Sequence, residues 1–298
     1  MQPILIVGNA VLDIVLNVDH YPSEDEEMRA ASRRAALGGN AANTAQVLAG
    51  LGRSVDLLAI LAPDGDAAEL RRLLAAAGVD SRHLVTAAGG HTPVSYILLH
   101  AANGSRTIVH HRELDELRFE DFAALPLHDY GWVHFEGRNV ATVARMIGHL
   151  REQGFAGAVS VELEKDRPGI DDLLPQADLV LCSRALAATR GHRDAASLLA
   201  ALRDRAPQAA LTCTWGEAGA WALGRDGALH HCPAHAPARV VDTIGAGDAF
   251  NAGMIAALAG GAELPAALSA ATALAGRKVG QPGFAGLDRL DGISLPLP

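Results

Sequence analysis

Lysine, cysteine and aromatic residues are scarce in this 298-residue sequence. Only two of its 25 basic residues are lysines, and no GxxxxGK[ST] string occurs, which excludes a Walker A phosphate-binding loop. Aromatic residues make up 4% of the chain, so a hydrophobic core must be built mainly from Ala, Leu, Val and Ile. Hydrophobic residues nevertheless reach 49%, which excludes disorder as the main state of the chain.

Features of a secreted, membrane-bound or nucleic-acid-binding protein are also missing. The three cysteines form no CxxC pair, and the N-terminus has no basic region or cleavage site, so we expect a cytoplasmic protein without a signal peptide. The longest apolar stretch, 252–276, is interrupted by Glu263 and Pro265, which indicates two buried helices rather than a membrane span. A net charge of −9 disfavours a nucleic-acid partner.

Short apolar runs alternate with helical patterns along most of the chain. The first run, 4–8 (ILIVG), is continuous and ends in glycine, which suits a strand buried on both faces of a parallel sheet. Such alternation predicts an α/β fold with a mostly parallel sheet, and the absence of a linker predicts one domain, 1–298. The predicted strands are 4–8, 55–61, 132–136, 157–162, 179–182 and 210–214, and the predicted helices are 43–51, 67–77, 141–153, 171–174 and 194–205.

Two segments, at about 11–37 and 93–112, do not follow this alternation. In the second, VSYILLH and RTIVHH flank a turn that contains Asn103 and Gly104, which is a strong hairpin signal. We expect the two segments to form one small β-sheet that acts as a lid over the edge of the α/β layers. Of His110 and His111, one is expected to face the site and the other to be solvated.

The string VVDTIGAGDAFNAG at 240–253 is the sharpest chemical signal in the sequence. Gly245, Ala246 and Gly247 precede a run that predicts a helix, and a helix N-terminus presents free backbone N–H groups that suit a phosphate. Asp248 stands at the same place, where a carboxylate makes sense if it takes a proton from a nucleophile attacking that phosphate. The alternative is that Asp248 is only the N-cap residue of the helix.

A second string, GGNAANTA at 38–45, places Asn40 and Asn43 three residues apart. Side chains at this spacing share one face of a helix, and neutral amides both donate and accept hydrogen bonds, which suits a polyol. The alternative is an Asn that caps the helix. Asp13 follows the first strand, where a carboxylate either accepts sugar hydroxyls or is a solvated turn residue.

Two other classes of site are not supported. GNAVLD follows the first strand where a dinucleotide-binding fold would have GxGxxG, which disfavours an oxidoreductase. His231, Cys232 and His235 are the best metal-binding cluster, but Pro233 breaks any helix that would align them. We therefore do not expect a zinc site.

Taken together, Asp13, GGNAANTA and DTIGAGDAF resemble the ribokinase (PfkB) family of carbohydrate kinases, and the similarity spans nearly the whole chain. The strings EGRN at 136–139 and VELEK at 161–165 favour the branch of this family that phosphorylates ketohexoses. The resemblance implies a three-layer α/β/α sandwich with a lid. It also implies transfer of the γ-phosphoryl group of ATP to a primary hydroxyl, most simply C1 of a ketohexose such as fructose.

The resemblance also implies a role for each site residue. Asp248 would be the general base, and Gly245, Ala246 and Gly247 would form the anion hole for the transferred phosphoryl group. The sugar would be bound by Asp13, Gly39, Asn40 and Asn43, and the nucleotide by Arg106, Gly216, Glu217, Ala218 and Gly219. The family further implies Mg²⁺ with ATP, a potassium ion near Asp242 and Ile244, and a homodimer formed through the lid.

One departure from the family pattern concerns the metal. Many members carry an NxxE string that organises Mg²⁺, whereas SRAL stands at 183–186 here. Glu136, Glu162 and Glu164 are candidates for that role, although Glu164 is more typical of a surface charge. Other substrates remain open: a sugar acid, ribose, a nucleoside or a modified hexose, with Arg138 or Arg29 available for an anionic group. A catalytically silent sugar or nucleotide sensor is the more distant alternative.

Overall fold

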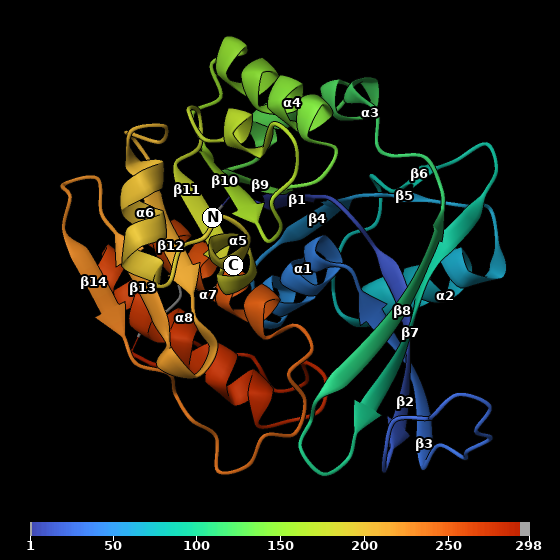
Figure 1. The fold of residues 1–298 in the computed structure, drawn as a ribbon. Coiled ribbons are helices and arrows are strands. Elements are labelled where there is room, and N and C mark those ends of the chain that lie inside the picture. The colour runs from blue at the N-terminus through green and yellow to red at the C-terminus, as the bar shows by residue number, and fades with distance from the viewer. Residues whose placement is uncertain (1, 293–298) are drawn as a thin grey trace.

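The first strand, β1 (Ile4–Val7), has apolar side chains on both of its faces. In the computed structural model, which describes residues 2–292, Ile4 and Ile6 belong to one hydrophobic core, and Leu5 and Val7 to another. Successive side chains of a strand point to opposite faces of the sheet, so this apolar run requires a helix layer on each side. The predicted three-layer α/β/α sandwich is confirmed (Figure 1).

Within residues 2–292 the main sheet has eight strands. Their order is β14 (Leu229–Cys232), β13 (Ala220–Leu223), β12 (Ala210–Thr214), β11 (Leu179–Ser183), β10 (Ala158–Leu163), β9 (Trp132–Glu136), β1 and β4 (Val55–Leu58). The strands from β12 to β4 are parallel, and β13 and β14 extend the sheet as an antiparallel hairpin. The chain adds β4 on one side of β1 and the later strands on the other, so β1 lies where the strand order reverses.

Helices cover both faces of this sheet. One core is formed with α1 (Asn40–Gly50), α2 (Gly65–Ala76), α7 (Ala246–Ala259) and α8 (Leu264–Val279). The other is formed with α3 (Phe119–Ala123), α4 (Val140–Glu152), α5 (Arg184–Thr189) and α6 (Ala195–Arg203). Short 3₁₀ helices connect these elements: η1 (Leu127–Asp129), η2 (Ile170–Leu173) and η3 (Gly216–Ala218). No helix within 2–292 is both long and apolar enough to span a membrane.

The two segments that leave the α/β alternation form a second sheet beside the first (Figure 1). Its order is β3 (Ser32–Gly38), β2 (Val11–Val18), β7 (His91–His100) and β8 (Arg106–Glu113). β2 and β7 are parallel, and the other pairs are antiparallel. We call this the small sheet. The hairpin predicted at Asn103 and Gly104 joins β7 to β8, whereas the single-domain organisation and the lid role stay predictions.

Several predicted boundaries differ from the structure. The helix expected at 43–51 begins at Asn40, because Gly39 takes a positive φ of 86° and serves as its N-cap residue. The strand expected at 55–61 is interrupted at Ala59, and its last residues form β5 (Ile60–Leu61), which pairs with β6 (Val85–Thr86) in a separate sheet. The short helix expected at 171–174 is η2.

Candidate active site

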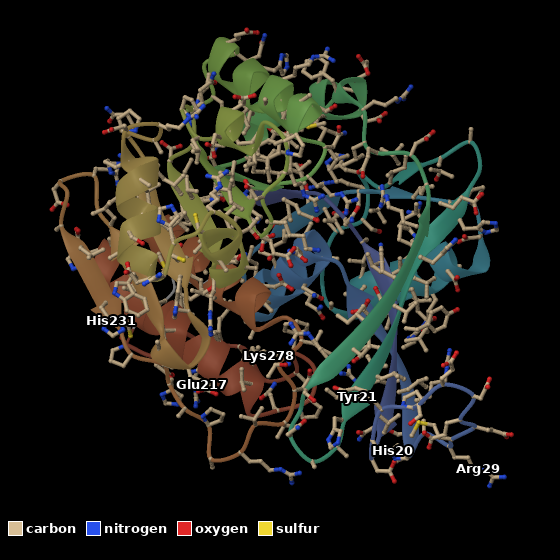
Figure 2. The ribbon with its side chains drawn as sticks, in the orientation of Figure 1. His20, Tyr21, Arg29, Glu217, His231 and Lys278 are labelled. Carbon is tan, nitrogen blue, oxygen red and sulfur yellow. The ribbon has the colours of Figure 1, made fainter. Side chains whose placement is uncertain are left out.

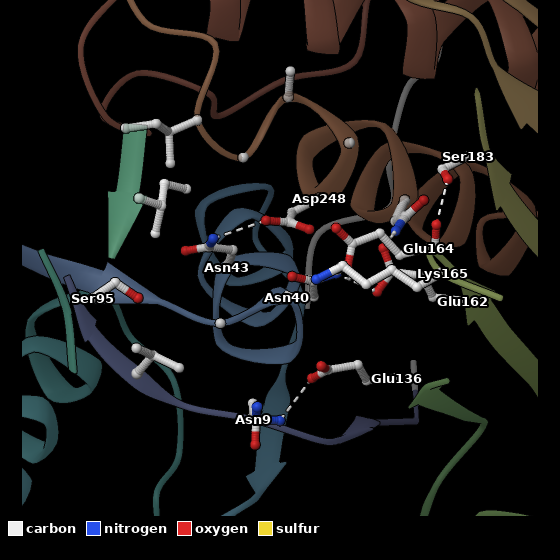
Figure 3. A pocket seen from close by; sticks show the side chains of 18 of the residues that line it. Asn9, Asn40, Asn43, Ser95, Glu136, Glu162, Glu164, Lys165, Ser183 and Asp248 are labelled. Carbon is white, nitrogen blue, oxygen red and sulfur yellow. Dashed lines mark hydrogen bonds and ion pairs between the residues drawn. The ribbon is translucent and has the colours of Figure 1, made fainter. Parts of the chain in front are cut away.

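The carboxyl ends of the parallel strands open into a cavity of about 490 Å³. Asn9 follows β1, Glu136 ends β9, and Glu162 lies near the end of β10; all three line this cavity. Ligands of open α/β sheets bind where the strand order reverses, and this place is the carboxyl end of β1. We call the cavity the pocket, and Figure 3 shows side chains that line it.

The N-terminus of α7 forms one wall of the pocket. Gly245 is its N-cap residue with φ of 74°, and a Cβ atom there would lie 2.2 Å from the ring of Phe284, so this turn requires glycine. The backbone N–H groups of Ala246 and Gly247 lie in the first turn, where a helix offers them no carbonyl acceptor. Because both residues line the pocket, they can bind an anion there.

Asp248 lies in the first turn of α7, three residues after the N-cap. The alternative that Asp248 only caps the helix is therefore wrong. Its side chain lines the pocket, is 7% exposed and accepts a hydrogen bond of 2.8 Å from Nδ2 of Asn43 (Figure 3). Burial raises the pKa of Asp248 to about 8, and the hydrogen bond from Asn43 opposes this rise. Such a carboxylate is a competent base near neutral pH.

The polar residues predicted to bind a sugar meet in this pocket. Asp13 lies within β2 and is buried, so the alternative of a solvated turn residue is wrong. Burial raises the pKa of Asp13 to about 6, while Ser95 and Arg34 lower it. Gly38 leaves room for this carboxylate, because a Cβ atom at Gly38 would lie 2.1 to 2.3 Å from its atoms. The residues that line the pocket include Asp13, Gly39, Asn40 and Asn43.

The two Asn residues of α1 hold carboxylates rather than cap the helix. Asn40 follows the N-cap Gly39, so the capping alternative is wrong here too. Nδ2 of Asn40 donates to Glu162 at 3.0 Å and to Glu164 at 3.2 Å. Glu164 directly follows β10 and is half-exposed, as expected of a charge at a strand end, and it also lines the pocket.

Two further pocket residues were missed in the sequence. Asn251 is buried, lines the pocket and donates to Oε1 of Glu162 at 2.9 Å. A polar residue three positions after Asp248 in an Ala-rich helix was the available signal. Ser95 also lines the pocket, and its signal was a single small polar residue within the apolar run of β7. Burial raises the pKa values of Glu136 and Glu162, and the charge of Asp248 raises that of Glu162 further.

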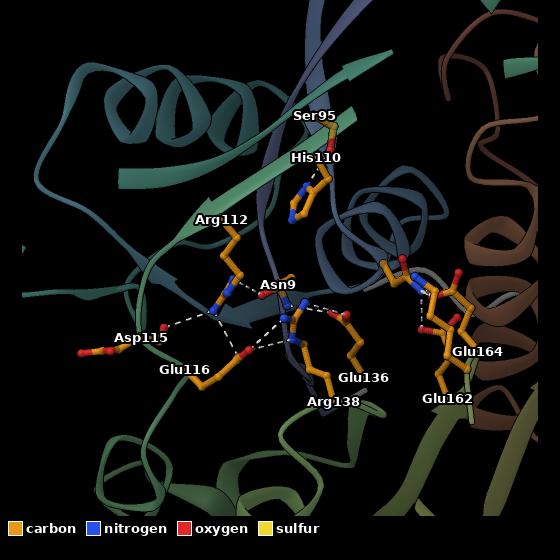
Figure 4. Close-up of polar contacts among 12 residues, drawn as sticks. Asn9, Ser95, His110, Arg112, Asp115, Glu116, Glu136, Arg138, Glu162 and Glu164 are labelled. Atoms are coloured by element: carbon orange, nitrogen blue, oxygen red, sulfur yellow. Dashed lines mark hydrogen bonds and ion pairs between the residues drawn. The ribbon is translucent and has the colours of Figure 1, made fainter. Parts of the chain in front are cut away.

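At the end of the pocket away from α7, charged side chains pair with one another (Figure 4). Arg112 of β8 donates to Oδ1 of Asn9 at 2.9 Å, which joins the small sheet to the end of β1. Arg138 lines the pocket, but it pairs with Glu116 at 2.8 Å and with Glu136 at 3.6 Å. Its positive charge is therefore already compensated.

A neighbouring cavity of about 1110 Å³ meets the pocket beside α7. Both cavities are lined by Arg106, whose guanidinium donates to Oγ1 of Thr243 at 2.7 Å. The larger cavity is also lined by Gly216, Glu217 and Gly219, so with Arg106 four of the five residues predicted for the nucleotide site lie together. Ala218 belongs to η3 between them but is not part of this lining.

Of the two residues predicted for potassium, Ile244 lines the pocket, and Asp242 is buried beside it and lines a neighbouring cavity. Oδ2 of Asp242 faces Nζ of Lys278 at 3.3 Å and a guanidinium nitrogen of Arg34 at 3.1 Å. Oδ1 accepts the backbone N–H of Ile244 at 2.9 Å. Because two cations already neutralise this carboxylate, its surroundings do not fit a further cation, and we derive no step through potassium.

Other candidate residues lie away from the pocket (Figure 2). His231 stacks on Trp221 with ring centroids 4.1 Å apart, and the structure shows no group of three His, Cys, Asp or Glu side chains arranged for a metal among residues 2–292. Arg29 is exposed in the loop between β2 and β3 and does not line the pocket. It is therefore not available to an anionic substrate in this arrangement.

Comparison with known proteins gives the class of the molecule. Residues 1–288 match the family model described as pfkB family carbohydrate kinase, and the chain belongs to this family. The protein is therefore a carbohydrate kinase, an enzyme that transfers a phosphoryl group to a sugar.

Among individual relatives, the chain is similar to ketohexokinase of Mus musculus, with 38% identity over 294 residues that cover 96% of this chain and 99% of the mouse protein. Its fold is similar to that of ribokinase from Giardia lamblia, with a TM-score of 0.83, 17% identity and coverage of 97% of each chain. It is also similar to Arabidopsis thaliana ribokinase complexed with ribose and ATP, with a TM-score of 0.78, 19% identity and coverage of 95% and 94%.

Proposed function

We propose that this enzyme transfers the γ-phosphoryl group of ATP to a primary hydroxyl of a ketohexose, namely C1 of fructose. The observation that carries the proposal is Asp248, a buried carboxylate with a raised pKa beside the free N–H groups of α7. The similarity to mouse ketohexokinase supports the choice of a ketohexose. Asp13, Asn40 and Asn43 supply acceptors and donors for several hydroxyl groups of a neutral sugar.

In this reaction Asp248 accepts the proton of the attacking hydroxyl, and Asn43 holds the carboxylate in position by its hydrogen bond. A base with a pKa near the working pH removes a proton most effectively. The backbone N–H groups of Gly245, Ala246 and Gly247 stabilise the negative charge of the transferred phosphoryl group. Phosphoryl transfer depends mainly on such positioning and electrostatic stabilisation.

ATP fits the larger cavity, with its phosphates directed to the place where the two cavities meet. Arg106 lies there, and a guanidinium can bind phosphate oxygens in a bidentate manner. Mg²⁺ carried by the nucleotide neutralises charge on the phosphate oxygens when bound. Carboxylate oxygens suit Mg²⁺, and Glu162 and Glu164 both line the pocket. Both oxygens of Glu162 already accept amide hydrogen bonds, so Glu164 is the more available of the two to hold the ion.

We propose that the small sheet acts as a lid and as the surface of a homodimer. Closure over the pocket would exclude water and limit hydrolysis of ATP. β8 is an edge strand of the small sheet. Val109 on β8 and Tyr96 on the neighbouring strand β7 are exposed apolar residues. An apolar surface beside an open strand edge favours pairing with a second copy. Light scattering of wild-type protein and Val109→Asp tests this, with monomers expected only for the variant.

Neutral substrates are favoured over anionic ones by the pairing of Arg138. Its guanidinium is held by Glu116 and Glu136, so a sugar acid would have to replace these partners. A silent sensor has no need of a buried base at an anion site, so Asp248 also favours catalysis over binding alone.

A coupled assay of ADP release with MgATP tests the proposal against fructose, ribose, tagatose, 2-keto-3-deoxygluconate and adenosine. We expect the highest kcat/KM for fructose, with the phosphate of the product attached at C1 by nuclear magnetic resonance. A clearly higher kcat/KM for another substrate would keep the kinase mechanism and overturn the ketohexose assignment. Binding of a sugar without turnover would overturn the catalytic role.

A further inference from the structure

A row of three polar side chains crosses the small sheet where it lines the pocket. Asp13 on β2 is the register partner of Ser95 on β7, and Ser95 is the partner of His110 on β8. Paired residues on neighbouring strands present their side chains on the same face. All three line the pocket, and the proposed reaction gives no role to His110.

The alternation of β8 determines which part of the pocket His110 reaches. Arg106, Ile108, His110 and Arg112 line the pocket, whereas His111 does not. Arg106 lies at the phosphate end, and His110 follows it by four residues, which is about 13 Å along a strand. His110 is therefore far from the transferred phosphoryl group and lies beside the part of the substrate that Asp13 binds.

The hydrogen bonds of Ser95 decide which nitrogen of His110 carries a proton. Oγ of Ser95 lies 3.1 Å from Nδ1 of His110. On its other side the register partner of Ser95 is Asp13, and the Ser95 side chain lowers the pKa of that carboxyl, as a donating hydroxyl does. A hydroxyl has one proton and a carboxylate can only accept, so Ser95 donates to Asp13 and accepts from Nδ1–H of His110. In the neutral ring Nε2 is then a bare acceptor.

Nε2 of His110 is available to a ligand. It forms no hydrogen bond with another side chain or backbone group of residues 2–292, and Figure 4 shows the ring edge opposite Ser95 pointing away from the strand. Burial lowers the pKa of His110, and the charges of Arg138, Arg112, Lys165 and His111 lower it further, so the ring stays neutral near pH 7.

We propose that Nε2 of His110 accepts a hydrogen bond from a sugar hydroxyl and so makes His110 a specificity-determining residue of the pocket. The proposal rests on the proposed function, because it requires that the pocket binds a sugar. A substrate that lacks this hydroxyl leaves Nε2 without a partner. The loss of one neutral hydrogen bond lowers kcat/KM about five- to tenfold.

The test measures kcat/KM for fructose and for its 3-deoxy, 4-deoxy and 6-deoxy analogues. Four proteins are compared: wild type, His110→Leu, His110→Gln and the control His111→Leu, which alters the opposite face of β8. We expect one analogue to be about five- to tenfold poorer than fructose for wild type and His111→Leu. This ratio should fall to about one for His110→Leu and recover in part for His110→Gln, whose amide oxygen also accepts.

The outcomes separate the two proposals. If fructose is phosphorylated and His110→Leu retains the wild-type ratios for all three analogues, His110 does not read a hydroxyl and this proposal is overturned. If wild-type enzyme does not phosphorylate fructose but phosphorylates ribose, the ketohexose assignment fails, and the 2-deoxy and 3-deoxy analogues of ribose test His110 in the same way. If no sugar is phosphorylated, both proposals fail.

Discussion

Replacing Asp248 with Asn should abolish most of the activity and at the same time stabilise the protein at neutral and alkaline pH. The reason is the pKa of this carboxyl, which burial raises from 3.8 to about 8. Between these values the folded state binds a proton that the unfolded state has lost, so the free energy of unfolding falls as the pH rises. An amide does not titrate, so the Asp248→Asn variant does not lose this part of its free energy of unfolding as the pH rises.

The magnitude follows from the same values. About three pH units separate 3.8 from neutrality, and each unit corresponds to about 1.4 kcal/mol, so the destabilisation at pH 7 is about 4 kcal/mol before other effects. The partial positive charge at the N-terminus of α7 offsets about 1–2 kcal/mol of this. We therefore expect Asp248→Asn to gain about 2–3 kcal/mol, which raises Tm by about 5 °C.

Thermal unfolding of both proteins between pH 5 and pH 9 measures this effect, and the ADP-release assay measures the activity. Loss of a general base should lower kcat by about 10²- to 10⁴-fold. The matched control is Asp56→Asn, because Asp56 is a buried carboxylate outside the pocket that accepts from Arg82 at 2.6 Å and from the hydroxyl of Tyr130. Its removal should lower stability by about 1–3 kcal/mol and leave kcat unchanged.

Two results would refute this reasoning. A kcat of Asp248→Asn within tenfold of wild type would show that Asp248 is not the base. A loss of stability above pH 7 similar to that of Asp56→Asn would show that the carboxylate is stabilised by its surroundings rather than destabilised by burial.

Three further predictions concern the anion site, the nucleotide and the cation. Gly245→Ala should lower kcat more than 100-fold, because a Cβ atom would displace the ring of Phe284 and the turn before α7. Sugar binding measured by calorimetry should persist. An unchanged kcat would contradict the anion-hole role. Arg106→Met should raise KM for ATP about tenfold and leave KM for the sugar unchanged, because one charge-assisted contact with phosphate is lost. A change in KM for the sugar alone would place Arg106 at the sugar site instead. Equal kcat in 100 mM K⁺ and 100 mM Na⁺ is expected, because Lys278 and Arg34 already neutralise Asp242, and strong activation by K⁺ alone would contradict this reading of the ion pairs.

The fold was predictable because each strand and helix has a local pattern of apolar residues and glycines in the sequence. The continuous apolar run of β1 and the glycine-terminated helical segments predicted the α/β alternation, and Asn103 and Gly104 predicted the hairpin. Boundaries were less predictable where backbone conformation decides them. The start of α1 depends on the positive φ of Gly39, which no periodicity of apolar residues reports.

The pocket was predictable only in part, because it is assembled from residues far apart in the sequence. The strings around Asp248 and Asn43 pointed to the proposed base and to its hydrogen-bond partner, although 205 positions separate them. Asn251 was not recognised, because its role depends on a contact with Glu162 that only the packed structure creates. His110 differs from His111 only by the side of β8 from which it projects.

The electrostatics of the pocket reconcile two opposing requirements. A phosphate needs positive charge, which the N-terminus of α7 and Arg106 supply, whereas a base needs surroundings that resist its ionisation. Burial and the nearby charges of Glu164 and Glu136 raise the pKa of Asp248, and these carboxylates lie on the β9 and β10 side of the pocket rather than at the helix end. In the proposed reaction, one wall would therefore attract the phosphate and another would keep Asp248 a strong base, and Asp248 lies where the two walls meet.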